Sequence, residues 1–195
     1  MMTLDFSNAY KTLDRSAMLS AIALKCPNFL PYDTFCNGAS TPLITEDFSI
    51  PSSTGTQQGD ACGPLFFAVT VHDAIVAANV AGTTWSHWYL DDASQAGPVA
   101  SLAAALDILI PRAAAVGLKL NRSKCKLWPW DCGLDFSTRY PSLAGISWVP
   151  WSAGLVVLGT PVGRAPFVRS QLAMIVDKLS AALDLLAASA SAAFC

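Results

Sequence analysis

The sequence predicts an α+β fold, in which an antiparallel sheet carries helices on one face. Three observations lead to this prediction. Two short segments, 1–6 and 85–90, have strand character and run into carboxylates. Two longer apolar stretches, 64–80 and 98–116, have the length of helices. An Ala-rich stretch at 167–194 carries apolar residues at helical spacing, which predicts an additional C-terminal helix.

A helix and a hairpin are expected after the first strand. Asp14 or Ser16 can cap a helix that runs to about Lys25, because side-chain oxygens accept hydrogen bonds from the free amides of a first turn. Prolines punctuate the segment 26–53, so we expect a connecting loop there, with a hairpin around 41–50.

Two long apolar helices form the middle of the predicted fold. Asp60 is the expected cap of the first, and Pro64 suits its first turn, where no amide partner is needed. The second is expected over 98–116, where Pro111 should kink or shorten it.

Between these helices, residues 83–95 predict a hairpin with two adjacent aspartates at its turn. Strand alternation places the side chains of residues 85, 87 and 89 on one face and those of 86, 88 and 90 on the other. Asp91 and Asp92 repel each other in a tight turn, which is poor structural design unless a cation neutralises the pair.

The last third of the chain is less regular. Gly117 is expected to end the second helix, and 117–127 reads as a turn followed by a strand. The aromatic-rich segment 128–151 is expected to be irregular, and 155–158 predicts one more strand.

Five segments occur in an order that is typical of one enzyme family. They are DFSNAY at 5–10, QQGDACGPLFF at 57–67, YLDD at 89–92, GLKLNRSK at 117–124 and LG at 158–159. In this order they resemble motifs A to E of the reverse transcriptase palm. The similarity is closest to the non-LTR retrotransposon (LINE-like) kind, with group II intron maturases as more distant relatives. It extends from Thr3 to about Arg169.

The resemblance implies a fold, a domain organisation and an activity. The fold would be a ferredoxin-like palm at 1–165, followed by a C-terminal Ala-rich helix at 166–195 as the start of a thumb. The activity would be RNA-directed DNA synthesis. The implied partners of the full-length ancestor are an RNA template, a DNA primer and deoxynucleoside triphosphates.

The resemblance assigns metal binding to Asp5, Asp91 and Asp92. Nucleotidyl transfer needs in-line attack of a hydroxyl on a phosphate, which two Mg²⁺ ions about 4 Å apart can promote. Mn²⁺ could replace them. Mg²⁺ prefers hard oxygen ligands and keeps several waters, so two or three carboxylates suffice. We therefore expect the three carboxylates to converge in the fold.

Four further residues match the motifs of the family. Tyr10 corresponds to the aromatic residue that lies under the incoming sugar and rejects a 2′-hydroxyl, while Gln58 and Gly59 match a pair that contacts nucleotide or template. Lys124 matches a lysine thought to protonate the leaving pyrophosphate or offset its charge. The chain departs from the family just after the Gln58–Gly59 pair, where Ala and Cys replace the frequent Pro and Leu.

The composition suits a palm-centred fragment better than a free-standing nucleic-acid binder. Charged residues make up 13% of the chain, apolar residues 53%, and the formal net charge is −2. The family carries basic fingers segments before motif A, whereas this chain begins four residues before Asp5. We therefore expect little polymerase activity from the 195 residues alone.

Two other functions remain open. A non-catalytic, truncated remnant of such an element would bind nothing specifically. A palm-type nucleotidyl cyclase is less favoured, because the Gln-Gly loop and Tyr10 belong to template-directed synthesis.

Membrane and secreted classes are disfavoured. The apolar stretch 65–80 is interrupted by His72 and Asp73, so it predicts a core helix and no membrane span. The six cysteines form no CxxC pair and no zinc-like spacing, so they are typical of reduced intracellular thiols, with no disulfide-linked partner. His72 and His87 lack a nucleophile at a recognisable spacing and are interpreted as structural.

Overall fold

The chain divides into two compact units in the computed structural model, which describes residues 1–44, 46–56, 59–128 and 138–192. The first unit comprises 1–127 and 134–147, and the second comprises 128–133 and 148–195. Packing therefore groups the hairpin before the C-terminal helix with that helix, whereas the sequence-based division grouped everything up to residue 165 together.

A five-stranded sheet forms the centre of the first unit, in the order β4-β5-β1-β6-β7. The pairings β4–β5, β5–β1 and β1–β6 are antiparallel, and the sheet as a whole is mixed. The predicted combination of helices, a sheet and a C-terminal helix is thus confirmed. The strands are β1 (Met2–Leu4), β4 (Trp85–Tyr89), β5 (Asp92–Ala96), β6 (Lys126–Leu127) and β7 (Ser147–Trp148).

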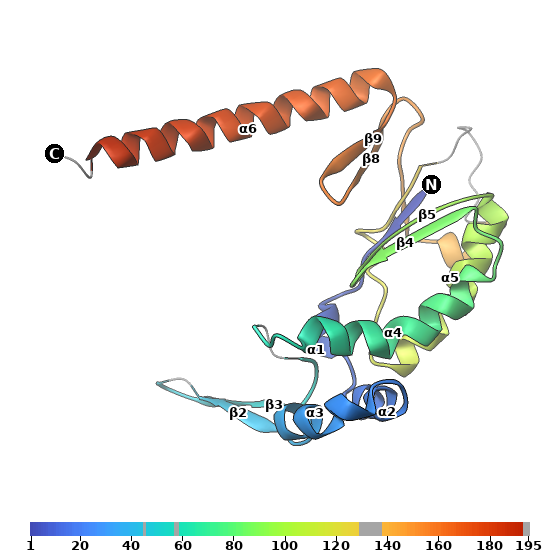
Figure 1. The fold of residues 1–195 in the computed structure, drawn as a ribbon. Coiled ribbons are helices and arrows are strands. Elements are labelled where there is room, and N and C mark those ends of the chain that lie inside the picture. The colour runs from blue at the N-terminus through green and yellow to red at the C-terminus, as the bar shows by residue number, and fades with distance from the viewer. Residues whose placement is uncertain (45, 57–58, 129–137, 193–195) are drawn as a thin grey trace. The chain divides into compact units, whose positions relative to one another are not determined.

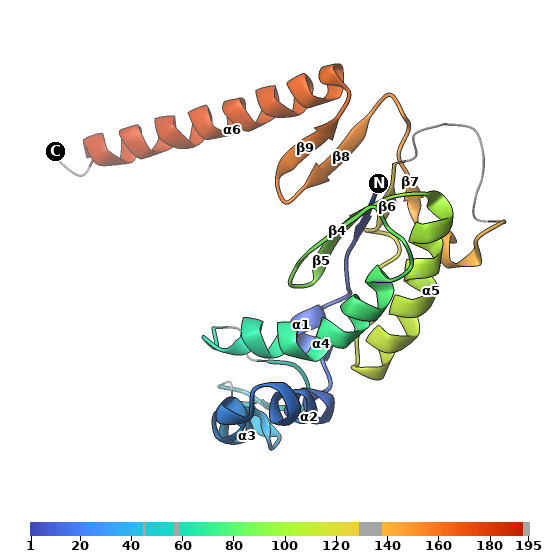
Figure 2. The same ribbon diagram turned by 45° about the vertical axis from the view of Figure 1, so that its right-hand side comes forward.

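Helices cover one side of this sheet. Figure 2 shows α4 (Gly63–Asn79) and α5 (Val99–Ala115) on the same side, with α2 (Arg15–Lys25) packed against α4. The core between them is apolar, and burying a large apolar side chain contributes about 1.5–3 kcal/mol. Its fully buried members include Met2, Phe66, Phe67, Leu102, Leu106 and Leu127.

The N-termini of the two predicted helices form differently. Asp14 caps α2 as predicted, since its Oδ1 accepts a hydrogen bond of 2.7 Å from the Ala17 amide. The prediction that Asp60 caps α4 is wrong, because that helix begins at Gly63 with Cys62 as its N-cap. Asp60 instead builds the preceding turn: its Oδ1 accepts from the Cys62 amide at 2.9 Å.

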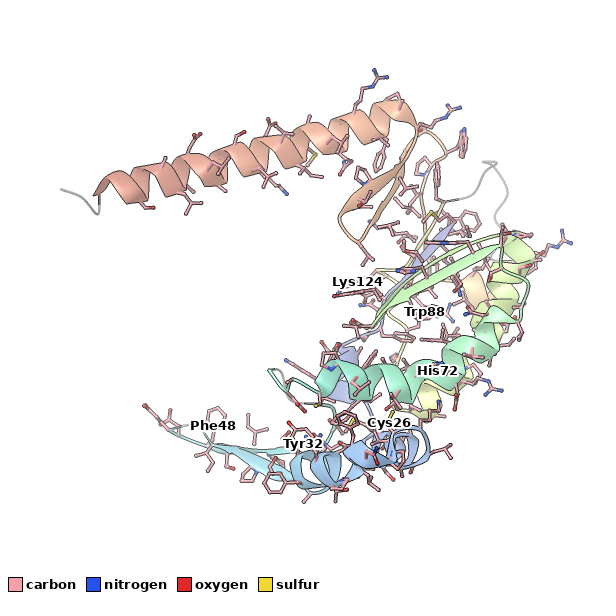
Figure 3. All side chains as sticks on the ribbon, in the orientation of Figure 1. Cys26, Tyr32, Phe48, His72, Trp88 and Lys124 are labelled. Carbon is pink, nitrogen blue, oxygen red and sulfur yellow. The ribbon has the colours of Figure 1, made fainter. Side chains whose placement is uncertain are left out.

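The segment 26–53 contains a helix that the sequence did not predict. A 3-10 turn, η1 (Pro27–Phe29), leads into α3 (Leu30–Asn37), where a proline occupies the first turn without losing a hydrogen bond. The hairpin expected after it is present as β2 (Thr41–Ile44) and β3 (Ser49–Ser52). Figure 3 shows Phe48 on this hairpin.

Pro111 does not shorten α5, which continues to Ala115. Gly117 follows the helix with a φ of +83°, a left-handed conformation that glycine adopts at little cost. A side chain there would also collide with the backbone around Thr12, so the close approach of this turn to the first unit's N-terminal part requires glycine. The strand expected nearby is only the two residues of β6.

The second unit is a hairpin followed by one long helix. Strands β8 (Gly154–Val157) and β9 (Thr160–Gly163) pair antiparallel, and the turn between them has positive φ at Leu158 and Gly159. Helix α6 (Ala165–Ala192) starts against the hairpin and then runs on as a single helix (Figure 1). Phe167, near the start of this helix, packs closely against the hairpin. Its phenyl ring is so near Gly154 that a side chain added there would lie only 2.7 Å from it.

Candidate functional site

The register of the sheet brings the predicted metal-binding aspartates to one end of it. Leu4 of β1 pairs with Ala93 of β5, so the next residues along each strand, Asp5 and Asp92, are neighbours. Tyr89 and Asp92 form the last pair of the β4–β5 hairpin, which leaves Asp91 in its turn. Motifs A and C are separated in the chain by helices α2, α3 and α4 and by the β2–β3 hairpin, and the pairing of β1 with β5 brings them together.

Asp5 has one carboxylate oxygen without a hydrogen-bond partner. Its Oδ2 lies 3.7 Å from Lys124 Nζ, while its Oδ1 is buried and has no hydrogen-bond partner. An unsatisfied buried polar atom costs about 1–3 kcal/mol, and a cation would remove that cost. The side chain as a whole is 25% exposed, although Oδ1 itself is buried.

The carboxylates influence one another electrostatically. Burial raises the pKa of Asp92, and the nearby charges of Asp91 and then Asp5 raise it further, while Lys124 acts in the opposite direction. Burial also raises the pKa of Tyr10, with a further contribution from Asp91. These couplings are expected of like charges gathered at one site.

Backbone hydrogen bonds hold the loop that presents Lys124. The Asn121 amide donates to the carbonyl of Asp5 at 2.8 Å, and the Lys124 amide donates to the carbonyl of Asn121 at 3.0 Å. The Ser7 amide donates to the carbonyl of Lys119 at 2.8 Å. Asp5 itself and Ser7, two residues further along, are thus tied to this loop, which is why the exposed Lys124 lies beside the sheet (Figure 3).

Tyr10 lies on α1 (Ala9–Thr12) and contacts both α4 and the loop that precedes it. Its ring stacks on Phe67 of α4, with centroids 4.8 Å apart and planes at 18°. Its carbonyl accepts a hydrogen bond of 2.9 Å from the Thr56 amide. A side chain at Gly55 would collide with that same carbonyl, so the loop that precedes α4 lies directly against Tyr10.

The two motif B residues are placed differently. Gln58 lies outside the described residues. Gly59 is exposed with a φ of +94°, and a side chain added there would meet nothing within 4 Å of the protein. Glycine is therefore favoured at this position by the backbone conformation alone, because there is room for a side chain.

Sequence reasoning missed Arg15, which holds the region between motifs A and B. The residue is 7% exposed, and its guanidinium donates to the carbonyls of Gly55 at 2.9 Å, Ser52 at 2.7 Å and Ala39 at 3.2 Å. Burial lowers its pKa, and the buried Asp33 opposes that effect. Its polar sequence neighbours indicate a surface position, so no local pattern could have revealed its role.

The donor set fits Mg²⁺ better than a transition metal. Within the described ranges, no group of three or more His, Cys, Asp or Glu side chains is arranged to hold a metal ion. Mg²⁺ is commonly bound through one or two carboxylates together with water and substrate phosphates, so a complete protein cage is not required. The carboxylate oxygens of Asp5, Asp91 and Asp92 are ligands of the right hardness.

Two further predictions concern the chain as a whole. No described helix is both long enough and apolar enough to cross a bilayer. Of the six cysteines, the four in the described part of the chain are free thiols, and Cys132 and Cys195 lie outside it. The four described free thiols are Cys26, Cys36, Cys62 and Cys125.

No protein-family model matches the chain, and no curated protein matches it either.

Proposed function

We propose that the chain is the palm of a retroelement reverse transcriptase, an RNA-directed DNA polymerase that works by two-metal nucleotidyl transfer. One observation carries the proposal. Asp5 and the Asp91–Asp92 pair, which are far apart in the sequence, meet at one end of the sheet beside a lysine, with a carboxylate oxygen left unpaired. The order of the five sequence motifs supports the same conclusion.

Asp5 and Asp91 are the residues proposed to hold Mg²⁺, with Asp92 adjacent and supporting. When bound, the two ions would activate the primer 3′-hydroxyl and stabilise the leaving oxygen. The raised pKa of Asp92 fits a site whose negative charge awaits a cation. Protonation of Asp92 and binding of the cation relieve the same repulsion, so the two are expected to compete.

Lys124 and Tyr10 are proposed to act on the nucleotide itself. The Lys124 ammonium would protonate the leaving pyrophosphate or offset its negative charge. Its contact with Asp5 would keep it near the reacting phosphates. Tyr10, held by its stack on Phe67, would exclude a 2′-hydroxyl by steric contact. Gln58 and Gly59 are proposed to contact the nucleotide or template from the loop before α4.

The second unit has a proposed role as well. The β8–β9 hairpin resembles a primer grip, and α6 is proposed as the start of a thumb. The partners proposed for the complete enzyme are the RNA template, the DNA primer and deoxynucleoside triphosphates.

Metal binding is the sharpest test, because it does not require the other polymerase subdomains. Mn²⁺ titration of the 195-residue chain, followed by electron paramagnetic resonance, should detect a site that Asp5→Asn and Asp91→Asn each weaken at least about tenfold. Asp107→Asn is the matched control, because Asp107 is an exposed aspartate on α5. It should bind Mn²⁺ like the wild type.

Primer extension on poly-rA/oligo-dT with dTTP and Mg²⁺ then tests the reaction, both on the 195-residue chain and on a protein that also carries the upstream fingers segments. Incorporation that depends on metal and on Asp91 supports the polymerase. A chain that binds Mn²⁺ no better than Asp5→Asn and Asp91→Asn, and that extends no primer, is instead the non-catalytic remnant.

A further inference from the structure

The strand register assigns each residue of the sheet to one of two faces, because directly opposed residues of antiparallel strands lie on the same face. One row across the sheet is Ser86, Gln95, Met2 and Leu127, and its last three members are fully buried. The adjacent row, on the other face, is His87, Ser94, Thr3 and Lys126.

Aromatic side chains lie at the edge of this second face. Trp85 and His87 point to the same side of the edge strand β4, and their rings are stacked with centroids 5.9 Å apart and planes at 12°. Trp85 is 45% exposed, and His87 is exposed as well. We call these two residues the aromatic pair. The strand that carries it leads directly to the Asp91 turn.

A cation lies across the sheet from the aromatic pair. His87 and the exposed Lys126 occupy the two ends of one row and are separated by three strand spacings of about 4.8 Å, or about 14 Å. Between them lie the small side chains of Ser94, which is buried, and Thr3, which is half-buried. A ligand would therefore meet flat aromatic surface at one end of the row and positive charge at the other.

We infer that the aromatic pair is a stacking platform for unpaired bases of a single-stranded nucleic acid, and that Lys126 contacts the phosphates of the same strand. Exposed aromatic rings combined with basic side chains are the usual means of binding single strands without sequence preference. A protein-docking surface would continue into further apolar side chains, whereas this row continues into two hydroxyl residues and a lysine.

The inference rests on the proposed function, because it supplies a place for template or primer next to the carboxylates. It also explains how a chain with a negative net charge would bind a nucleic acid. With a net charge of −2, the chain attracts phosphates weakly overall, so base stacking has to supply a larger share of the affinity than in a basic protein.

Binding of fluorescein-labelled oligo-dT and oligo-rU to the chain, measured by fluorescence anisotropy in EDTA and low salt, tests the platform. Trp85→Ala and His87→Ala should each weaken binding by about 5- to 100-fold, and Trp85→Phe should retain most of it. Phe35→Ala is the matched control, because Phe35 is an 88% exposed aromatic on α3, and it should bind like the wild type. Circular dichroism of each variant checks that it is folded.

Lys126→Gln tests the phosphate contact. It should weaken binding and reduce the slope of log affinity against log salt by about 0.7, the value for one phosphate contact on a single strand. An unchanged slope overturns the assignment of Lys126.

The outcomes separate this inference from the polymerase proposal, because metal is absent from the assay. Asp91→Asn should bind oligonucleotides at least as well as the wild type, since it removes a charge that repels phosphate. No binding by the wild type up to about 100 μM, or equal losses in Trp85→Ala and Phe35→Ala, overturns the platform and leaves the Mn²⁺ result untouched.

Discussion

Asp91 occupies the turn of the motif C hairpin, beside a second carboxylate. In a protein that also carries the upstream fingers segments, we expect Asp91→Asn to reduce Mg²⁺-dependent primer extension by on the order of 100-fold or more, because it removes a ligand of the proposed metal pair. Stability should not fall, since the substitution relieves repulsion with Asp92. Extension rates and urea denaturation of the same preparations measure both effects, and extension at the wild-type rate would contradict the assignment of Asp91.

Asp92 makes a prediction about pH. Its pKa is raised in the folded chain, so its ionised form is less favourable there than in the unfolded chain. The resulting loss of stability develops as the pH rises through the ordinary aspartate pKa of 3.8 and is complete above the raised folded value. Asp92→Asn should therefore stabilise the chain at pH 7, by up to about 1 kcal/mol for a charge so near the surface.

The pH dependence is also the check on this prediction. Urea denaturation at pH 7 and at pH 3 should show the stabilising effect of Asp92→Asn only at the higher pH. Saturating Mg²⁺ should reduce the difference at pH 7, because the cation neutralises the same charges. An effect that is equal at both pH values would mean that repulsion is not its source.

The contacts of Arg15 predict how strongly helix α2 is held to the neighbouring hairpin and loop. Its guanidinium joins helix α2 to the β2–β3 hairpin and to the loop before α4. Arg15→Met should cost about 3–5 kcal/mol, because buried carbonyls lose their donor and Asp33 loses its nearby positive charge. Urea denaturation measures the cost, and limited proteolysis should show earlier cleavage in the hairpin.

The control for Arg15 is another arginine of the same unit. Arg112 is exposed on α5, so Arg112→Met should change stability by no more than about 0.5 kcal/mol. Equal costs for the two substitutions would show that the contacts of Arg15 do not hold the region together.

The exposed apolar residues of helix α6 predict that the whole molecule associates in concentrated solution. Its apolar residues Leu172, Leu179 and Leu186 recur every seven residues and are 48%, 59% and 65% exposed. Exposed apolar surface of this extent favours association. Replacing all three with Gln should lower light scattering of concentrated samples while the helical circular dichroism is retained, and Ser180→Gln, on an exposed polar position, should have no effect. Unchanged scattering would place the association elsewhere.

The sequence by itself determined the elements whose signals are local. Strand alternation around Trp85 and His87, the aspartate cap of α2, the hairpin at 41–52 and the apolar helices were all readable, because each depends on residues a few positions apart. The candidate site residues were chosen from the sequence motifs, each of which is contiguous. What the motifs do stays a prediction.

Local signals failed where distant contacts decide the structure. The prolines of 26–53 indicate a loop, yet α3 forms there. Pro31 is tolerated in its first turn, and the polar side chains of Asp33 and Asn37, which suggest a surface position, are buried by the rest of the chain, where Asn37 donates a hydrogen bond to Asp33. Asp60 is a good cap by its type, but it accepts a hydrogen bond from the hydroxyl of Tyr32 on α3 and builds a turn instead.

Only the tertiary structure decided which groups meet. Pairing of β1 with β5 places Asp5 beside Asp92, and the loop tied to the Asp5 carbonyl brings Lys124 to its carboxylate. The burial of Arg15 depends on carbonyls about forty residues away. Such contacts combine free-energy terms from segments that are remote in the chain, so no pattern of neighbouring residues contains them, and they form only when the sheet and its helices pack together.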